Sequence, residues 1–279
     1  MKIPRIIFNF NDKCLNGCPF CFIPFDGAGT GTPEHWKRIL ERLNDFSPDL
    51  ISFSGCDPLF YDAFYDVLAD TDKNCLWGVD TSLIYLNREK FSRVYNKIDL
   101  ISTSLDDVPE MEKPQRYDKK KLDVFYDNLD YVQTLMPNIV LHTLCSPINK
   151  NYLIHIADRL IARGIHTWSL YQFWPFDIIR NSKQFEISDP EFEQIGRRLT
   201  KYCESKIDFN YVHNSGRVNG YFFVSSIGEV YTTIDSKPAK YLKLGSVFDK
   251  DIAQKWAENS MPEKAVSILN MKINREKFK

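Results

Sequence analysis

Three cysteines near the start of the chain have the type and spacing of a metal-binding loop. Cys14, Cys18 and Cys21 follow the pattern C-x3-C-x2-C. Three thiolates on one short loop can ligate three irons of a [4Fe-4S] cluster, which normally takes four cysteines. The fourth iron then stays open to a small molecule. A structural zinc site is the alternative, but zinc also needs a fourth protein ligand, and the nearest histidine, His35, falls in a predicted helix.

A second candidate segment, Gly55-Cys56-Asp57-Pro58, directly follows an apolar run at residues 50–54. The glycine allows the backbone to approach a ligand closely, and the aspartate can accept a hydrogen bond from an ammonium group. An ordinary turn at the end of a strand is the alternative interpretation. The position of the segment, one strand and one helix after the cysteine loop, favours the binding interpretation.

Polar and aromatic residues also follow later apolar runs. Thr81 and Ser82 come after the third run, and Ser104 and Asp106 after the fourth. A hydroxyl and a carboxylate there can bind sugar hydroxyls, although Ser and Asp equally serve as caps of helices and turns. Tyr171 lies near the end of the sixth run. Its ring can stack on an adenine or a substrate, or pack in the core.

Alternating strand and helix patterns position these candidates. Such alternation predicts βαβ units and a parallel sheet, and function in these folds collects at the carboxyl ends of the strands. Thr32 and Pro33 are expected to begin the first helix, and Asn149 or Asn151 to cap the fifth. The predicted strands are residues 5–10, 50–54, 75–80, 100–104, 139–145 and 166–173, and the predicted helices are 33–44, 60–69, 88–96, 119–135 and 151–162.

Composition limits the class of protein. The chain has 279 residues, of which 43% are hydrophobic, so it can bury a large core. The formal net charge of −1 gives no overall basic footprint for a long nucleic acid. No apolar run is long enough for a membrane span, and the first residues lack the hydrophobic region of a secretory signal. Seven cysteines, three of them clustered, argue against a disulfide framework and predict a reducing cytoplasm.

The two motifs together resemble those of the radical S-adenosylmethionine (SAM) enzymes. That family has an aromatic residue before the third cysteine, as Phe20 is here, and a Gly-Gly-Glu-Pro segment, which residues 55–58 match with Cys56 and Asp57 as departures. The resemblance covers roughly residues 5–175. It implies an open barrel of six βα units, a [4Fe-4S] cluster, and reductive cleavage of SAM to a 5′-deoxyadenosyl radical that abstracts a substrate hydrogen. The implied cluster ligands are Cys14, Cys18 and Cys21.

The resemblance also implies which residues hold SAM. Residues 55–58 bind its amino group, Thr81-Ser82 resembles a Thr-Asn-Gly stretch, and Ser104 with Asp106 resembles an element that reaches the ribose. Arg116 is a candidate partner for the SAM carboxylate, since arginine binds carboxylates bidentately, although a solvated surface arginine is equally consistent. The expected set is Phe20, Gly55, Cys56, Asp57, Pro58, Thr81, Ser82, Ser104, Asp106, Arg116 and Tyr171.

The chain is predicted to divide into a barrel, residues 1–180, and a capping extension, residues 181–279. In the extension we expect a helix through Tyr202 with Ser188 or Asp189 as its cap, a hairpin at residues 221–225 and 229–233, and a short helix at 250–257. Phrases in this α+β extension resemble those around auxiliary clusters in other family members. Because no cysteine follows Cys203, this extension is predicted to lack such a cluster.

Three hypotheses for the function remain open. The phrases Cys18-Pro-Phe-Cys21-Phe22 and Trp168-Ser-Leu-Tyr-Gln172 resemble the viperin-like branch, which implies a nucleotide or other small molecule, with Arg116, Arg180 and Lys183 as candidate phosphate-binding cations. A short precursor peptide is the second hypothesis. A cysteine-liganded metal or redox module that does not use SAM is the third. Either SAM-dependent hypothesis implies a flavodoxin- or ferredoxin-like electron donor.

Overall fold

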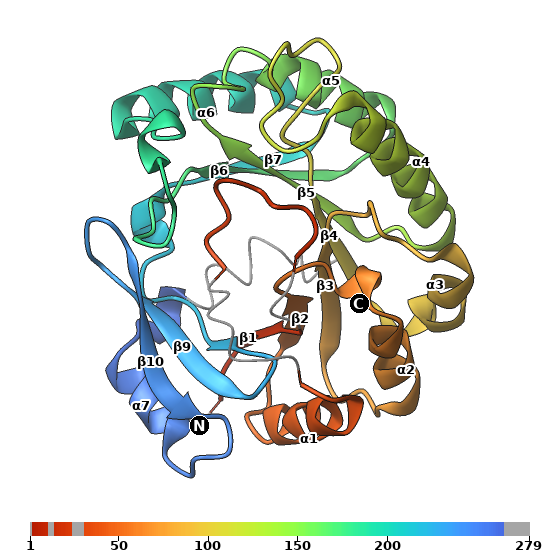
Figure 1. The fold of residues 1–279 in the computed structure, drawn as a ribbon. Coiled ribbons are helices and arrows are strands. Elements are labelled where there is room, and N and C mark those ends of the chain that lie inside the picture. Colours follow the sequence, from red (N-terminus) through yellow and green to blue (C-terminus); the bar gives the residue numbers. More distant parts are fainter. Residues whose placement is uncertain (1, 11–13, 24–30, 265–279) are drawn as a thin grey trace.

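A single ten-stranded sheet forms the frame of the molecule in the computed structural model, which describes residues 2–10, 14–23 and 31–264. The strands lie in the order β10-β9-β8-β1-β2-β3-β4-β5-β6-β7 and curve into an unclosed barrel (Figure 1). The strands are β1 Arg5–Asn9, β2 Leu50–Ser54, β3 Leu76–Thr81, β4 Leu100–Ser104, β5 Ile139–Cys145, β6 Thr167–Gln172, β7 Asp208–Val212, β8 Phe223–Val224, β9 Glu229–Ile234 and β10 Lys240–Ser246.

Helices connect the first strands and cover the outer face of the sheet (Figure 1). β1 to β6 pair in parallel with their sequence neighbours, so the expected open barrel of six units is confirmed. The predicted strands and helices of these units match the observed bounds to within about two residues. The helices are α1 Pro33–Asn44, α2 Asp62–Asp70, α3 Arg88–Val94, α4 Lys119–Leu135, α5 Leu153–Ala162, α6 Asp189–Cys203 and α7 Ile252–Glu258.

The helix starts follow local capping chemistry at most positions. The Thr32 side chain accepts a hydrogen bond from the backbone amide of His35 at the start of α1, and the Ser188 side chain accepts one from the amide of Glu191 at the start of α6. Both residues therefore act as N-caps. The expected cap of α5 is wrong. The Asn149 amide side chain instead donates to the carbonyls of Asp106 and Leu144, and α5 starts without a side-chain cap.

The last hundred residues extend the sheet at both edges. β7 pairs in parallel with β6, and β8 pairs in parallel with β1. The predicted hairpin is present as β8 and β9, and β10 adds antiparallel to β9. The sequence interpretation contained neither β7 nor β10. The expected boundary near residue 180 therefore falls between strands of one continuous sheet.

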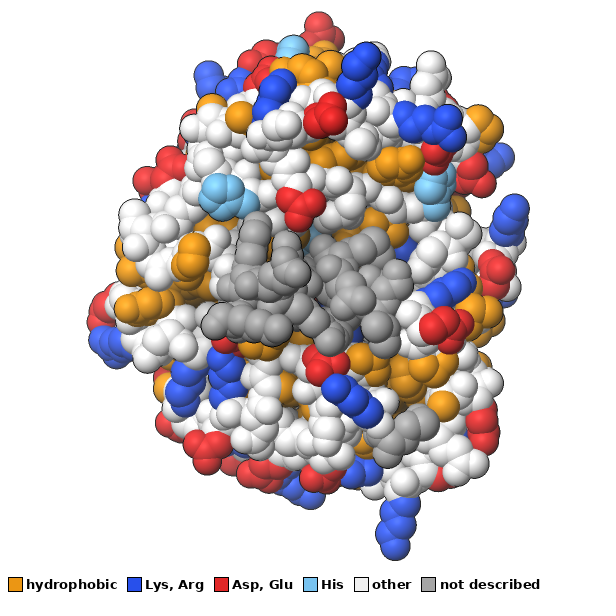
Figure 2. Space-filling view, turned by 180° about the vertical axis from the view of Figure 1, so that it is seen from behind, with side chains coloured by type: hydrophobic (Ala, Val, Ile, Leu, Met, Phe, Trp, Pro, Cys, Tyr) orange, Lys and Arg blue, Asp and Glu red, His pale blue; other side chains and the backbone are white. Residues whose placement is uncertain are grey.

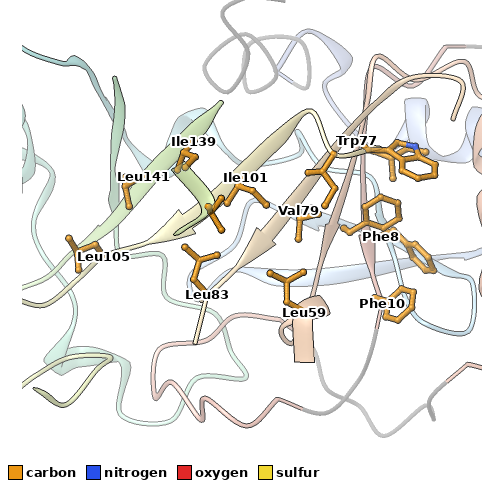
Figure 3. Packing of buried hydrophobic residues seen from close by; sticks show 14 of the residues in the cluster. Phe8, Phe10, Leu59, Trp77, Val79, Leu83, Ile101, Leu105, Ile139 and Leu141 are labelled. Carbon is orange, nitrogen blue, oxygen red and sulfur yellow. The ribbon is translucent and has the colours of Figure 1, made fainter. Parts of the chain in front are cut away.

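Side chains alternate between an apolar outer face and a small, polar inner face. Figure 3 shows Phe8, Val79, Ile101 and Leu141, which come from β1, β3, β4 and β5, and all four are fully buried in one hydrophobic cluster. Each such side chain contributes about 1.5–3 kcal/mol through burial. Several positions that face the other way carry small side chains, among them Ser52, Gly78, Ser102 and Ser169. Ser54 at the end of β2, and Ser102 and Ser104 on β4, line a cavity inside the barrel.

The surface carries charges of both signs. Figure 2 shows blue and red side chains interspersed over the face opposite to that in Figure 1, in keeping with the formal net charge of −1. That face therefore offers no continuous basic surface of the kind that binds nucleic acid. None of the helices in the described part of the chain has the length and hydrophobicity that crossing a membrane requires.

Candidate active site

The hollow interior opens into a cavity of about 270 Å³ at the carboxyl ends of the strands. The segment that follows β1, which carries the three cysteines, crosses this end of the barrel (red in Figure 1). Most of the predicted site residues line the cavity, whereas Asp57, Pro58 and Asp106 do not. Those that line it are Cys14, Cys18, Phe20, Cys21, Gly55, Cys56, Thr81, Ser82, Ser104, Arg116 and Tyr171.

The three cysteines of the loop are free thiols that face one cavity. A hydrogen bond from Cys56 lowers the pKa of Cys14 to about 6. Burial raises the pKa of Cys18, and it raises the pKa of Cys21 to about 12. A neutral thiol is the stable form of a buried cysteine, and a bound metal centre reverses that preference because it deprotonates the thiols that coordinate it.

The donor set fits a cluster better than a single ion. Within the residues that the structure describes, no three His, Cys, Asp or Glu side chains converge closely enough to hold one metal ion. In a cubane cluster each thiolate binds a different iron, so the sulfur atoms are spread more widely than around a zinc ion. Cys14, Cys18 and Cys21 are therefore suited to holding three corners of a [4Fe-4S] cluster.

Gly55 and Cys56 form a tight turn beside the loop. Both have positive φ angles, +70° and +52°, a region that glycine adopts at little cost. A Cβ on Gly55 would lie 2.5 Å from the Cβ of Asn9 at the end of β1. The turn is therefore pressed against β1, which brings the Cys56 thiol to Cys14.

We expect Gly55→Ala to destabilise the protein and to weaken SAM binding, because the added methyl group must displace Asn9. Gly164→Ala is the matched control, since Gly164 has a φ of +66° but nothing within 4 Å of the added Cβ. The control should cost only the backbone strain of about 1–2 kcal/mol. Urea unfolding and calorimetric titration with SAM measure the two effects. Equal losses of stability in both variants, with unchanged SAM affinity in Gly55→Ala, would contradict the close packing.

Asp57 is a buried structural acceptor behind this turn. Its carboxylate accepts from the Thr81 hydroxyl at 2.7 Å, from the Ser82 amide at 2.8 Å and from the Leu59 amide at 3.2 Å, and also from the Ser82 hydroxyl. Burial raises the pKa of Asp57, and these hydrogen bonds oppose the rise. The structure thus places Asp57 where it holds Thr81 and Ser82 at the cavity wall rather than in the cavity itself.

Asp106 plays a similar supporting part for Arg116. The fully buried Asp106 carboxylate accepts from Arg116 Nε at 2.5 Å and from the Leu144 amide at 2.6 Å. Arg116 Nη1 lies 3.6 Å from Cys18 Sγ, and its guanidinium carbon lies 4.9 Å from the centre of the Phe20 ring. Although burial opposes it, the charges of Asp106 and Cys18 raise the pKa of Arg116 well above its usual value. Arg116 is therefore a fixed cation beside the cysteine loop.

Sequence reasoning did not identify the role of Asp107. Its carboxylate accepts from the backbone amides of Arg116 at 2.8 Å and Tyr117 at 2.7 Å, and from that of Gln115. Burial and the neighbouring Asp106 raise the pKa of Asp107 to about 6, against the effect of these amides. The two adjacent acids therefore fix different parts of Arg116: Asp106 binds its side chain, and Asp107 binds its backbone amide.

The sequence interpretation did not single out two arginines of the inner wall. Arg5 from β1 and Arg217, which follows β7, both line the cavity. His142, on β5, also lines it, with Nε2 2.6 Å from the Ser102 hydroxyl. By contrast, Arg180 and Lys183, the cations expected to meet a phosphate, are exposed and do not line the cavity.

Comparisons with known proteins agree with this architecture. The family model described as Radical SAM superfamily matches residues 8–160. Among solved structures, the chain resembles Streptococcus suis SuiB with a TM-score of 0.66 at 13% sequence identity. The match covers 82% of this chain and 60% of the SuiB chain. Native anSMEcpe with bound AdoMet and Cp18Cys peptide has a TM-score of 0.72 at 12% identity, covering 93% of this chain and 82% of that one. No curated protein matches the sequence.

Proposed function

Because this chain belongs to the radical SAM superfamily, we propose that it cleaves SAM reductively and uses the resulting radical to abstract a hydrogen atom from a small molecule or nucleotide. The observation that carries this proposal is the convergence of Cys14, Cys18 and Cys21 on one cavity inside the barrel. The family assignment weighs against a metal or redox module that does not use SAM.

A [4Fe-4S] cluster on the three cysteines, when bound, supplies the electron that splits SAM into methionine and a 5′-deoxyadenosyl radical. The chain's own residues orient the reactants. The backbone at Gly55 and Cys56 can approach the SAM amino group closely, and Arg116 offers a fixed positive charge beside Cys18. Ser104 offers a hydroxyl at the end of β4 for the ribose.

Aromatic side chains close the cavity around these groups. Phe22 stacks on Phe176 with ring centres 5.4 Å apart, and Phe20 packs edge-on against Phe185 at 5.5 Å. The Tyr241 hydroxyl donates to the Phe22 carbonyl at 2.6 Å and so ties β10 to the cysteine loop. Apolar rings beside the cavity limit the access of water, which protects a reactive intermediate from side reactions.

A small substrate suits the interior of the barrel. Ser54, Ser102 and Ser104 present short side chains on β2 and β4, and the free space lies beside them inside the barrel. The viperin-like resemblance of residues 18–22 and 168–172 points to the same class of substrate. The cations that a phosphate would meet there are Arg5 and Arg217.

Deoxyadenosine release tests the proposal. The protein, purified without oxygen and reconstituted with iron and sulfide, should release 5′-deoxyadenosine from SAM when dithionite replaces the flavodoxin- or ferredoxin-like donor. We expect one member of a panel of nucleoside triphosphates to raise this rate sharply. No release under any reducing condition contradicts SAM cleavage. Release that no small molecule in the panel stimulates contradicts the substrate class alone.

A peptide substrate is the second candidate, and two observations favour it. SuiB has been solved with its precursor peptide SuiA, and its fold resembles that of this chain with a TM-score of 0.66. An extended peptide can add to a free sheet edge. The hairpin at residues 221–233 is not free, because β8 and β9 pair with β1 and β10; the edge strand on that side of the sheet is β10. A short peptide that stimulates deoxyadenosine release where nucleotides do not would establish this alternative.

A further inference from the structure

Arg217 is a buried cation for which the described residues offer no ion pair. Only 6% of the residue is exposed, and it follows a short 3-10 turn at Asn214–Gly216. Its Nε donates to the Tyr221 hydroxyl at 3.2 Å. Its two terminal nitrogens have no hydrogen-bond acceptor, and no carboxylate lies within 4.0 Å of them, among the residues that the structure describes. A charged group that is largely removed from water and faces a cavity gains from an anionic partner.

Aromatic rings hold this guanidinium in place. Its central carbon lies 4.8 Å from the ring centre of Trp174, 5.0 Å from that of Tyr171 and 5.6 Å from that of Phe22. Cation–π contacts offset part of the cost of burial, but a ring face accepts no strong hydrogen bond from the terminal nitrogens. The rings therefore orient a donor pair toward the cavity without satisfying it.

Arg5 is a second buried cation of the same cavity. It is 5% exposed, and within the described residues its guanidinium makes only long contacts of 3.4 Å to the Ser52 hydroxyl. Among the described residues that line the cavity, Asp80 is the only one with a carboxylate. Asp80 has an interaction of its own, and no ion pair within 4.0 Å joins it to Arg5 or Arg217 in the described part of the chain. Arg116, the remaining arginine of the wall, is already paired with Asp106. The inner wall thus carries two positive charges for which the described residues offer no ion pair.

We infer that Arg217 and Arg5 form a subsite for an anionic oxygen group of the substrate, a phosphate or a carboxylate. This inference rests on the proposed function and deepens it, because it gives the chemical class of the molecule that enters the barrel. A planar guanidinium binds two oxygens of such a group side by side. The flanking Tyr171 and Tyr221 hydroxyls lie at the same cavity and can contribute further hydrogen bonds.

Anion binding to the reconstituted protein tests this subsite. Calorimetric titrations with inorganic pyrophosphate and with malonate, each with and without saturating SAM, separate a phosphate from a carboxylate. We expect saturable binding of at least one of the two. Arg217→Met, which keeps an unbranched side chain among the aromatic rings, and Arg5→Met should each weaken it by about tenfold or more, the loss expected for charged hydrogen bonds.

Two further variants keep the test decisive. Arg217→Lys keeps the charge without the paired donors and should lose less affinity than Arg217→Met, and it serves if the methionine variant does not fold. Arg180→Met is the matched control, because Arg180 is exposed and does not line the cavity; it should bind the anion as the unchanged protein does.

Three outcomes would overturn the inference. They are the absence of binding for both anions, unchanged binding in Arg217→Met, and loss of anion binding when SAM is added. The last outcome would mean that the arginines serve the carboxylate of SAM itself. Because the readout is heat rather than turnover, a failure of SAM cleavage is detected separately, as missing deoxyadenosine, and leaves the anion result intact.

Discussion

Cys14→Ala, Cys18→Ala and Cys21→Ala should each reduce the bound iron from about four atoms per chain to near zero and abolish deoxyadenosine release. The reason is that three thiolates already fall one short of the usual four ligands of a cluster, so the loss of another leaves two. Iron and sulfide analysis, together with the visible absorption of the anaerobically reconstituted variants, measures the effect.

Cys203→Ala is the matched control for this experiment. Cys203 is buried at the end of α6 and does not line the cavity, so its replacement should leave the iron content unchanged. Two results would contradict the assignment of the cluster ligands. One is full iron retention in the variant that lacks all three loop cysteines, and the other is about eight irons per chain, which would require a second cluster.

Asp106→Ala should cost about 3–5 kcal/mol of unfolding free energy, the loss expected when one partner of a buried ion pair is removed. Asp106 is fully buried, and its absence leaves the charge of Arg116 and the amide of Leu144 without their acceptor. Urea unfolding of the metal-free protein measures the loss. Asp106→Asn keeps an acceptor without the charge and should lose less.

An exposed pair provides the control for Asp106. Asp127 meets Arg88 at the surface, with 76% of the Asp127 side chain exposed, and Asp127→Ala should cost at most about 1 kcal/mol. The double variant Asp106→Ala/Arg116→Met removes both charges and should recover part of the lost stability. If Asp106→Ala lowers the free energy of unfolding no more than Asp127→Ala does, the buried pair of Asp106 and Arg116 does not stabilise the fold.

Local patterns were sufficient to predict the six βα units. The α1 helix follows from the Thr32 cap, Pro33 in the first turn and an apolar stripe of Trp36, Ile39, Leu40 and Leu43. All of this information lies within one short stretch of sequence. The central strands are similarly clear, because a strand that is buried on its outer face reads as an alternating apolar run.

The two edge strands were not predicted because their signals are weaker. β10 has charged and half-exposed positions and a register shift between Lys243 and Gly245, so its pattern is interrupted. β7 has only one fully buried position, Val212. Both strands depend on partners that are distant in sequence, and no local pattern reports those partners.

The residues of the candidate site also differ in whether a local sequence motif identifies them. The cysteine spacing and the turn at Gly55 are local motifs, and the sequence identified them. Arg217 lies in a turn without any motif, and only the folded chain brings it beside Tyr171 and Trp174. Asp57 and Asp106 were expected in the cavity, but each instead supports a neighbour from behind. Sequence identifies the type of group that is available, whereas the direction of a short side chain depends on the folded backbone.

The pairing of β8 with β1 also bears on the order of assembly during synthesis. Ile7 is partnered with Phe223, at opposite ends of the described chain, and such distant contacts form late because a long loop must close first. Until the ribosome has made β8, one edge of β1 is open, and the loop that β1 leads into lacks the tie from Tyr241 to Phe22. We therefore expect cluster insertion to follow completion of the polypeptide, and nascent or C-terminally truncated chains to expose an edge prone to aggregation.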